Sequence, residues 1–188
     1  MDRKEFINLS PEHIKSLDSR LEALLTLKVH LQETIETFNK YSSVGKNLCT
    51  CMGKLSESFK CEEFQFDPTL QSISNLLDTF RETLFDHYNS IKEHIINPLA
   101  SFVCNDIKSA EEAGKSRSQY LENYNKTVEN FVSLKKGKNY KEGPNAELEV
   151  LEGKLISIQQ QAVFSDFLLY RSLELVERKK LIEITATV

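Results

Sequence analysis

The chain has 188 residues, of which 40% are hydrophobic and 28% charged, and its formal net charge is −4. This balance is too apolar for a disordered chain and too polar for a membrane-spanning one. A mildly acidic chain is not typical of a general nucleic-acid binder, so we expect no nucleic-acid partner. The four prolines and six glycines are about half the usual share, which excludes a turn-rich β fold and favours a few long helices.

Proline-containing start signals divide the chain into helices. Ser10–Pro11 and Asp67–Pro68 each combine a capping side chain with proline at the first helical position, and Gly143–Pro144 is a weaker version. The predicted helices span 11–62, 69–136 and 145–185, and the loop 137–144 joins the last two.

The spacing of apolar residues supports all three helices. The first helix has heptad spacing from Ile14 to Phe38, and this seam then shifts to a row from Tyr41 to Phe59. The second helix follows an 11-residue repeat, typical of a nearly straight seam. One row of that repeat reads Leu77, Tyr88, Leu99, Ala110 and Leu121, and the seam of the third helix runs from Leu148 to Val176.

Helix length predicts the architecture. A helix over 69–136 would be roughly 100 Å long at 1.5 Å per residue. A compact globule of this size has a radius of gyration of only about 16 Å. The expected fold is therefore all-α, an elongated antiparallel three-helix coiled coil. Pro98 stands alone inside the second helix, where we expect it to kink the helix.

Apolar residues on a second face of the third helix predict a homodimer, because one three-helix bundle needs a single apolar face on each helix. The first half of the second helix is similarly apolar. A second copy of the chain is the simplest cover for both. The predicted dimer interface comprises Leu77, Phe80, Leu84, Tyr88, Ile91, Phe167, Leu168 and Leu175.

Lysines are concentrated around the loop 137–144. The stretch 108–141 carries eight cations and four acids, a net charge of +4 in an acidic chain, and 135–141 holds four lysines and no acid. One interpretation is a solvated loop whose lysines favour a helix C-terminus. The other is a basic surface for anionic lipid headgroups. The candidate membrane-binding residues are Lys115, Lys126, Lys135, Lys136, Lys138 and Lys141.

Motifs for catalysis or cofactor binding are absent from the sequence, so we expect no enzyme, no cofactor and no metal site. The cysteines form no C-x-x-C pair, and the charged N-terminus has no apolar signal region, which indicates a reducing, cytoplasmic environment. His87 and His94 are interpreted as a surface or interface pair. Asp106 and Arg117 interrupt the apolar rows of the second helix and are expected to pair with a neighbouring helix.

These features resemble the BAR domains of Arf-GAP proteins of the ACAP and ASAP type, of the Rho-GAP proteins GRAF and oligophrenin, and of the APPL adaptors. The strongest similarity is the segment from Ile96 to Lys108, which is similar to the family pattern "PL..F...D(L/I)K". Further similarities are Ser10–Pro11, Gly45–Lys46, Lys135–Lys136, Asp166–Leu168 and Val176–Lys180. His13–Ile14 departs from the aromatic-Arg pair of the family, and 111–115 is less basic than its counterpart.

The resemblance implies a crescent-shaped homodimer that binds, senses or bends anionic membranes as a peripheral protein. It also implies a larger GAP or adaptor protein, in which a PH domain usually follows, and makes a small GTPase a candidate partner. The alternative is a structural coiled-coil scaffold or tether that binds proteins and no lipid. A lysine-rich surface favours the first hypothesis, because a scaffold needs no charge asymmetry.

Overall fold

The computed structural model describes residues 11–64, 66–136 and 146–186, and the side chains of 12–64, 66–136 and 148–180. Within these ranges the chain forms helices and no strand, so the expected all-α fold is confirmed. The elements are α1 (Pro11–Ser58), η1 (Glu62–Phe64), α2 (Pro68–Ile91), η2 (Lys92–Ile96), α3 (Asn97–Ser101), η3 (Phe102–Ile107), α4 (Lys108–Lys136) and α5 (Ala146–Ala186). The predicted helix 69–136 thus corresponds to five consecutive helical elements.

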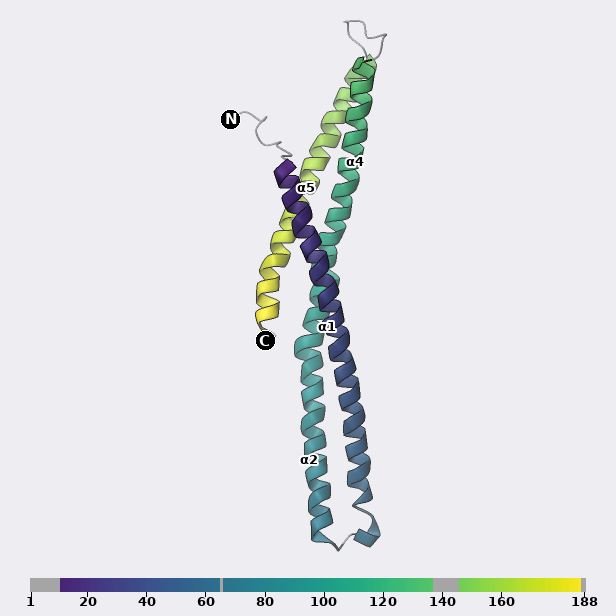
Figure 1. Cartoon of the computed structure of the whole chain (residues 1–188), viewed down its shortest axis with the longest axis vertical. Helices are drawn as coiled ribbons and strands as arrows, with labels where there is room; N and C mark the ends of the chain where they lie inside the picture. Colours follow the sequence, from purple (N-terminus) through teal and green to yellow (C-terminus); the bar gives the residue numbers. More distant parts are fainter. Residues whose placement is uncertain (1–10, 65, 137–145, 187–188) are drawn as a thin grey trace. The chain divides into compact units, whose positions relative to one another are not determined.

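The chain divides into two compact units (Figure 1). Unit 1 comprises 1–27 and 105–182, and contains the start of α1 together with α4 and α5. Unit 2 comprises 28–104 and 183–188, and contains the rest of α1 paired with the segment from α2 to α3. Each unit is described separately below.

The core of unit 1 combines large side chains from three helices with small residues of α4. Ala110 is fully buried, and a methyl group on Gly114 would come within 2.5 Å of Leu21 Cδ2, so α1 and α4 approach closely there. This close approach buries apolar surface, which stabilises the folded state by about 25 cal/mol per Å² of apolar surface buried. The largest buried side chains of this core are Leu17, Leu24, Ile107, Leu169, Leu173 and Val176.

A buried ion pair crosses the core of unit 1. Arg117 of α4 donates through Nε to Asp166 of α5 and through Nη1 to Asp18 of α1, the latter over 2.5 Å. Burial disfavours the charged guanidinium, but the hydrogen bonds with Asp166 and Asp18 outweigh it and raise the pKa of Arg117. Asp106 also pairs with α5, because Lys179 Nζ donates to it over 2.6 Å. Both breaks in the apolar rows therefore pair with neighbouring helices, as expected.

Small residues form the face of α1 that packs on α2 in unit 2. Ser42, Gly45, Cys49, Gly53 and Ser56 are all buried and recur every three or four residues. The Ser56 and Ser74 hydroxyls are hydrogen-bonded over 2.8 Å. Met52 is buried beside this face, whereas several other large side chains of the same helix point elsewhere. The predicted seam from Tyr41 to Phe59 was only partly right: its members Gly45 and Met52 are buried, whereas Tyr41, Leu48 and Leu55 are exposed.

The start of α2 follows the sequence signal. Asp67 is the N-cap, and its Oδ1 accepts hydrogen bonds from the backbone N–H groups of Thr69, over 2.9 Å, and Leu70, over 3.3 Å. Pro68 occupies the first turn, where its missing N–H is not needed. Asp67 and Pro68 therefore mark the end of the connection between α1 and α2. Helix α1 itself ends at Ser58, and not at residue 62 as expected.

Two π-helical segments flank Pro98. In η2 the N–H of Asn97 donates to the carbonyl of Lys92, five residues earlier, and η3 is a second π-helical stretch. A proline ring clashes with the carbonyl four residues before it, and a wider π turn at that point relieves the clash. The helix thus continues through Pro98, and a kink at this residue stays a prediction.

Candidate functional site

The basic end of α4 carries two exposed lysines in its last turn, Lys135 and Lys136. The Nζ atom of Lys135 lies 4.8 Å from the centroid of the Phe131 ring, a cation–π contact that leaves the ammonium at the surface. No residue that the structure describes forms an ion pair with either lysine. Lys138 and Lys141 lie outside the described residues.

The two other candidate lysines of α4 are already bound to acids of the same helix. Lys115 Nζ lies 2.7 Å from Glu111 Oε1, and Lys126 Nζ lies 2.6 Å from Glu122 Oε1. These hydrogen bonds raise the pKa of both lysines and lower the pKa of Glu122. Each pair is locally neutral, so its lysine adds less to a basic surface than Lys135 or Lys136 does.

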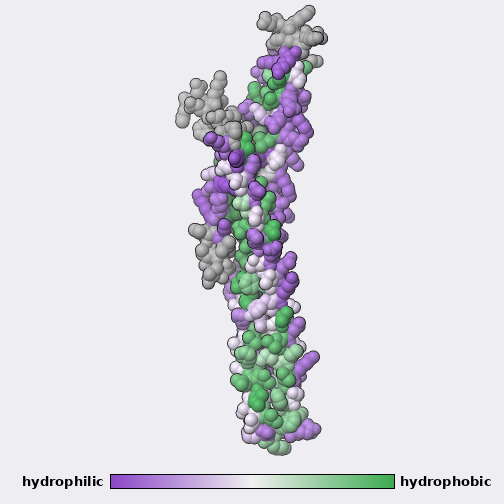
Figure 2. Space-filling view, viewed as in Figure 1, coloured by the Kyte–Doolittle hydropathy of each residue, from purple (hydrophilic) through white to green (hydrophobic). Residues whose placement is uncertain are grey.

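A wide apolar surface covers one side of the unit 2 hairpin. Figure 2 shows apolar side chains gathered there over α1 and α2. Isolated exposed apolar residues are common, but a contiguous patch marks a site of association. Its members include Tyr41, Val44, Leu48 and Leu55 of α1 and Ile73, Leu76 and Phe80 of α2, each at least 40% exposed.

The predicted interface residues of α2 are not all at the surface. Phe80 is 55% exposed, and Leu77 and Leu84 are half-buried. Tyr88 and Ile91 are buried within the chain at 6% and 8% exposure, so they offer little area to a second copy. The sequence placed them in the same rows as Leu77 and Phe80 but did not separate inward from outward positions.

A second exposed apolar surface lies on α5 in unit 1. The side chain of Phe167 is 56% exposed, that of Leu168 40% and that of Leu175 50%. The neighbouring Phe164 is 60% exposed. All four come from the second apolar row of the third helix. The opposite side of α5 fills the core with Leu169, Leu173 and Val176, so this helix is apolar on two faces as the sequence indicated.

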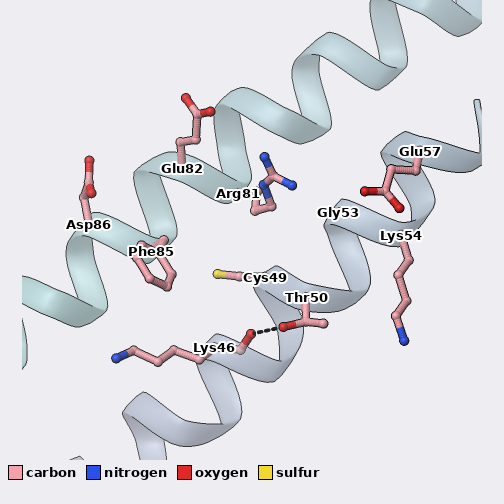
Figure 3. A pocket seen from close by; sticks show the side chains of 10 residues that line it. All are labelled: Lys46, Cys49, Thr50, Gly53, Lys54, Glu57, Arg81, Glu82, Phe85 and Asp86. Carbon is pink, nitrogen blue, oxygen red and sulfur yellow. Dashed lines mark hydrogen bonds between the residues drawn. The ribbon is translucent and has the colours of Figure 1, made fainter. Parts of the chain in front are cut away.

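A groove of about 790 Å³ opens between α1 and α2 (Figure 3). With 3.6 residues per turn, it falls on the side of the hairpin opposite the apolar surface. Its cations and acids balance, and Figure 3 shows Glu82 and Asp86 of α2 pointing away from α1. The groove therefore has no single sign of charge and no converging ligands. Its charged residues are Lys46, Lys54, Arg81, Glu57, Glu82 and Asp86.

Sequence reasoning missed the exposed aromatic residues at the α1–α2 connection. Phe66 is 89% exposed and Phe64 is 43% exposed. The available signal was two phenylalanines inside a predicted loop, where an apolar side chain has no helical partner. Within the described residues, no cluster of His, Cys, Asp or Glu is arranged to hold a metal ion, and no helix is both long and apolar enough to cross a bilayer.

Comparison with family models identifies a family for this chain. A family model described as the BAR domain of the APPL family matches residues 3–187, nearly the whole sequence. A search of curated proteins found no match.

Proposed function

Because the chain belongs to the BAR domains of the APPL family, we propose that it is a dimerising module that binds anionic, curved membranes through the basic end of α4. BAR domains in general are non-enzymatic, dimeric modules that bind membranes or sense their curvature. The family thus supports the general class. Lipid charge, the binding residues and the dimer interface are the proposal.

The observation that carries the lipid-binding part is the state of Lys135 and Lys136. Both are exposed at the end of a helix, and neither is paired with an acid of the described chain. An unpaired lysine near an acidic leaflet contributes about 1 kcal/mol to binding. Lys138 and Lys141 continue the same basic run in the sequence, and we assign them the same role. Lys115 and Lys126 rank below these four because each is bound to a glutamate.

The dimer part is supported by the two exposed apolar surfaces, one on the unit 2 hairpin and one on α5. Obligate interfaces bury about 2,000 Å² or more and are apolar, like a domain core cut in half. Phe80, Phe167, Leu168 and Leu175 are large, apolar and at least 40% exposed, which suits such an interface. We propose that a second copy of the chain covers both surfaces, with Leu77 and Leu84 at their edge.

Peripheral attachment on the cytoplasmic side of a membrane follows from this proposal, and a small GTPase is the candidate protein partner. The second candidate function is a scaffold that binds proteins and no lipid. The paired lysines of α4 and the balanced charges of the α1–α2 groove favour it, because neither surface attracts an anion. The two functions differ in whether lipid binding depends on Lys135 and Lys136.

Co-sedimentation with liposomes tests the proposal. The variant Lys135→Glu with Lys136→Glu should bind phosphatidylserine vesicles close to a thousandfold more weakly, since two cations are lost from each of two copies at about 1 kcal/mol each. Binding by the unchanged protein should also fall as salt is raised, because the Debye length shrinks to about 8 Å at physiological ionic strength.

The matched control is Lys46→Glu with Lys54→Glu, which changes the net charge equally but on unit 2. It should retain most of the binding. Equal loss in both variants would mean that net charge, rather than the basic end of α4, governs binding. Vesicle binding that ignores salt and both variants would exclude the electrostatic mechanism, and no vesicle binding at all would favour the scaffold.

A further inference from the structure

Phe66 is an exposed aromatic residue directly before the N-cap of α2. Next to it, Asp67 caps α2 with two side-chain hydrogen bonds, and the N–H of Asp67 donates to the carbonyl of Phe64 over 3.1 Å. At 89% exposure, the ring contacts almost nothing in its own chain. A phenylalanine buries roughly 150–250 Å² when it is covered, so leaving it in water is unfavourable.

A pocket in unit 1 has the size for one aromatic ring. It lies between α4 and α5, has a volume of about 190 Å³, and is walled by Ala113 and Tyr120 on one side and Phe164 and Leu168 on the other. A cavity of roughly 150 Å³ is known to hold a benzene molecule. All of the lining residues are uncharged, which disfavours a charged occupant because its lost hydration would not be replaced.

We propose that Phe66 of one copy docks in the α4–α5 pocket of a second copy, and that the second copy returns the same contact. This inference rests on the proposed dimer and adds the residues that set its register. The pocket is continuous with the apolar surface of α5, because Phe164 and Leu168 belong to both. Each copy offers one ring and one pocket, so two identical contacts close the pair.

The charges around the ring favour a protein partner over a bilayer. Glu62, Glu63 and Asp67 surround the two phenylalanines, and an anionic leaflet would repel them. Two rings bury far less than the roughly 2,000 Å² of an obligate interface, so this contact positions the copies while the wider apolar surfaces hold them together.

A double-mutant cycle tests the contact, with the dimer dissociation constant measured by sedimentation velocity. Phe66→Ala removes the ring, and Ala113→Leu fills the pocket. Each should weaken the dimer by about 100-fold, since truncating an anchor residue costs a factor of ten or more at each of two contacts. The double variant should be no weaker than the weaker single variant, because both changes remove one interaction. Val150→Ala, which truncates a 73% exposed side chain of α5, should have no effect.

Photo-crosslinking tests the same contact without removing the ring. Replacing Phe66 with p-benzoylphenylalanine should yield covalent dimers on illumination, with the linked residues mapping to α4 and α5 around the pocket. Additive effects in the cycle, a link within one chain, or a link to vesicle lipid in place of protein would overturn the inference. If the wild-type chain is monomeric, the proposed dimer itself is excluded. If Phe66→Ala leaves the dimer dissociation constant unchanged, only this contact is excluded and the proposed dimer stands.

Discussion

The ring of Tyr88 lies directly against the backbone of Gly45. A methyl group built on Gly45 would be 2.0 Å from Cζ of Tyr88, which is closer than real carbon atoms approach. The ring also meets Tyr41 edge-on, with centroids 5.4 Å apart. The absence of a side chain at residue 45 is therefore what allows α1 and α2 to pack around an aromatic residue.

Gly45→Ala should destabilise the protein by about 1–3 kcal/mol, the usual range for overpacking a tight core. Urea unfolding followed by circular dichroism measures the change. Gly153→Ala is the matched control, because nothing lies within 4 Å of the position of its added methyl group. That variant should be more stable by about 0.5–1 kcal/mol, since alanine is the better helix former. A stable Gly45→Ala protein would contradict the packing described for unit 2.

Arg117→Ala should cost about 3–5 kcal/mol, because it leaves the buried carboxylate of Asp166 without its cation. The double variant Arg117→Met with Asp166→Leu should recover most of that loss or exceed the wild type. The pair is incompletely satisfied, since Arg117 Nη2 and Asp166 Oδ2 have no hydrogen-bond partner among the described residues. Thermal and urea unfolding of the three proteins distinguishes the cases. Equal loss in the single and double variants would show that the ion pair itself is required.

Phe80→Asp should break the proposed dimer, because it places a charge on a 55% exposed aromatic position of the apolar surface. We expect the dissociation constant to rise at least 100-fold by sedimentation velocity, while the helix content stays the same. Asn75→Asp adds the same charge on the groove side of α2 and should leave the dimer intact. If Phe80→Asp remains dimeric, the apolar surface of unit 2 is not the interface.

Pro98→Ala should restore a backbone N–H and relieve the clash of the ring with the carbonyl of His94, and so remove the expected kink. The small-angle X-ray scattering curve of the protein should change, while the unfolding transition remains cooperative. Pro68→Ala serves as the comparison, because a proline in the first turn of α2 bends nothing. Superimposable scattering curves for wild type and Pro98→Ala would mean that residue 98 has no geometric role.

Much of this arrangement could be predicted from apolar spacing, and the exceptions share one cause. Leu17, Leu24 and Leu31 are buried at heptad spacing, and Tyr88, Leu99 and Ala110 are buried at eleven-residue spacing. The prediction was only partly right in the second half of α1, where Gly45 and Met52 of the predicted row are buried but its large members Tyr41, Leu48 and Leu55 are exposed. There small polar residues such as Ser42 and Ser56 form part of the inner face, and no hydrophobicity pattern selects them.

The candidate site was harder to predict than the fold. A cluster of lysines near the end of a long helix, such as the one that includes Lys135 and Lys136, can be recognised in the sequence because several cations occur close together. Whether a lysine is bound to a glutamate depends on side-chain geometry, which separates Lys126 from Lys136 only in the structure. In the same way, the sequence showed that Arg117 needed a partner but did not identify Asp166, which is four residues after the buried Ala162.

The π-helical segment η3 has a consequence for how the chain tolerates insertions and deletions. A π turn contains one residue more than α-helical hydrogen bonding requires, so deleting the exposed Cys104 should be absorbed by conversion of η3 to an α-helix. Deleting Ser109, in the α-helical part, should carry the buried stripe of Ala110, Gly114 and Arg117 about 100° around the helix axis relative to the residues before it. A gap in related sequences is therefore expected to fall within 102–107 and not in the first turns of α4.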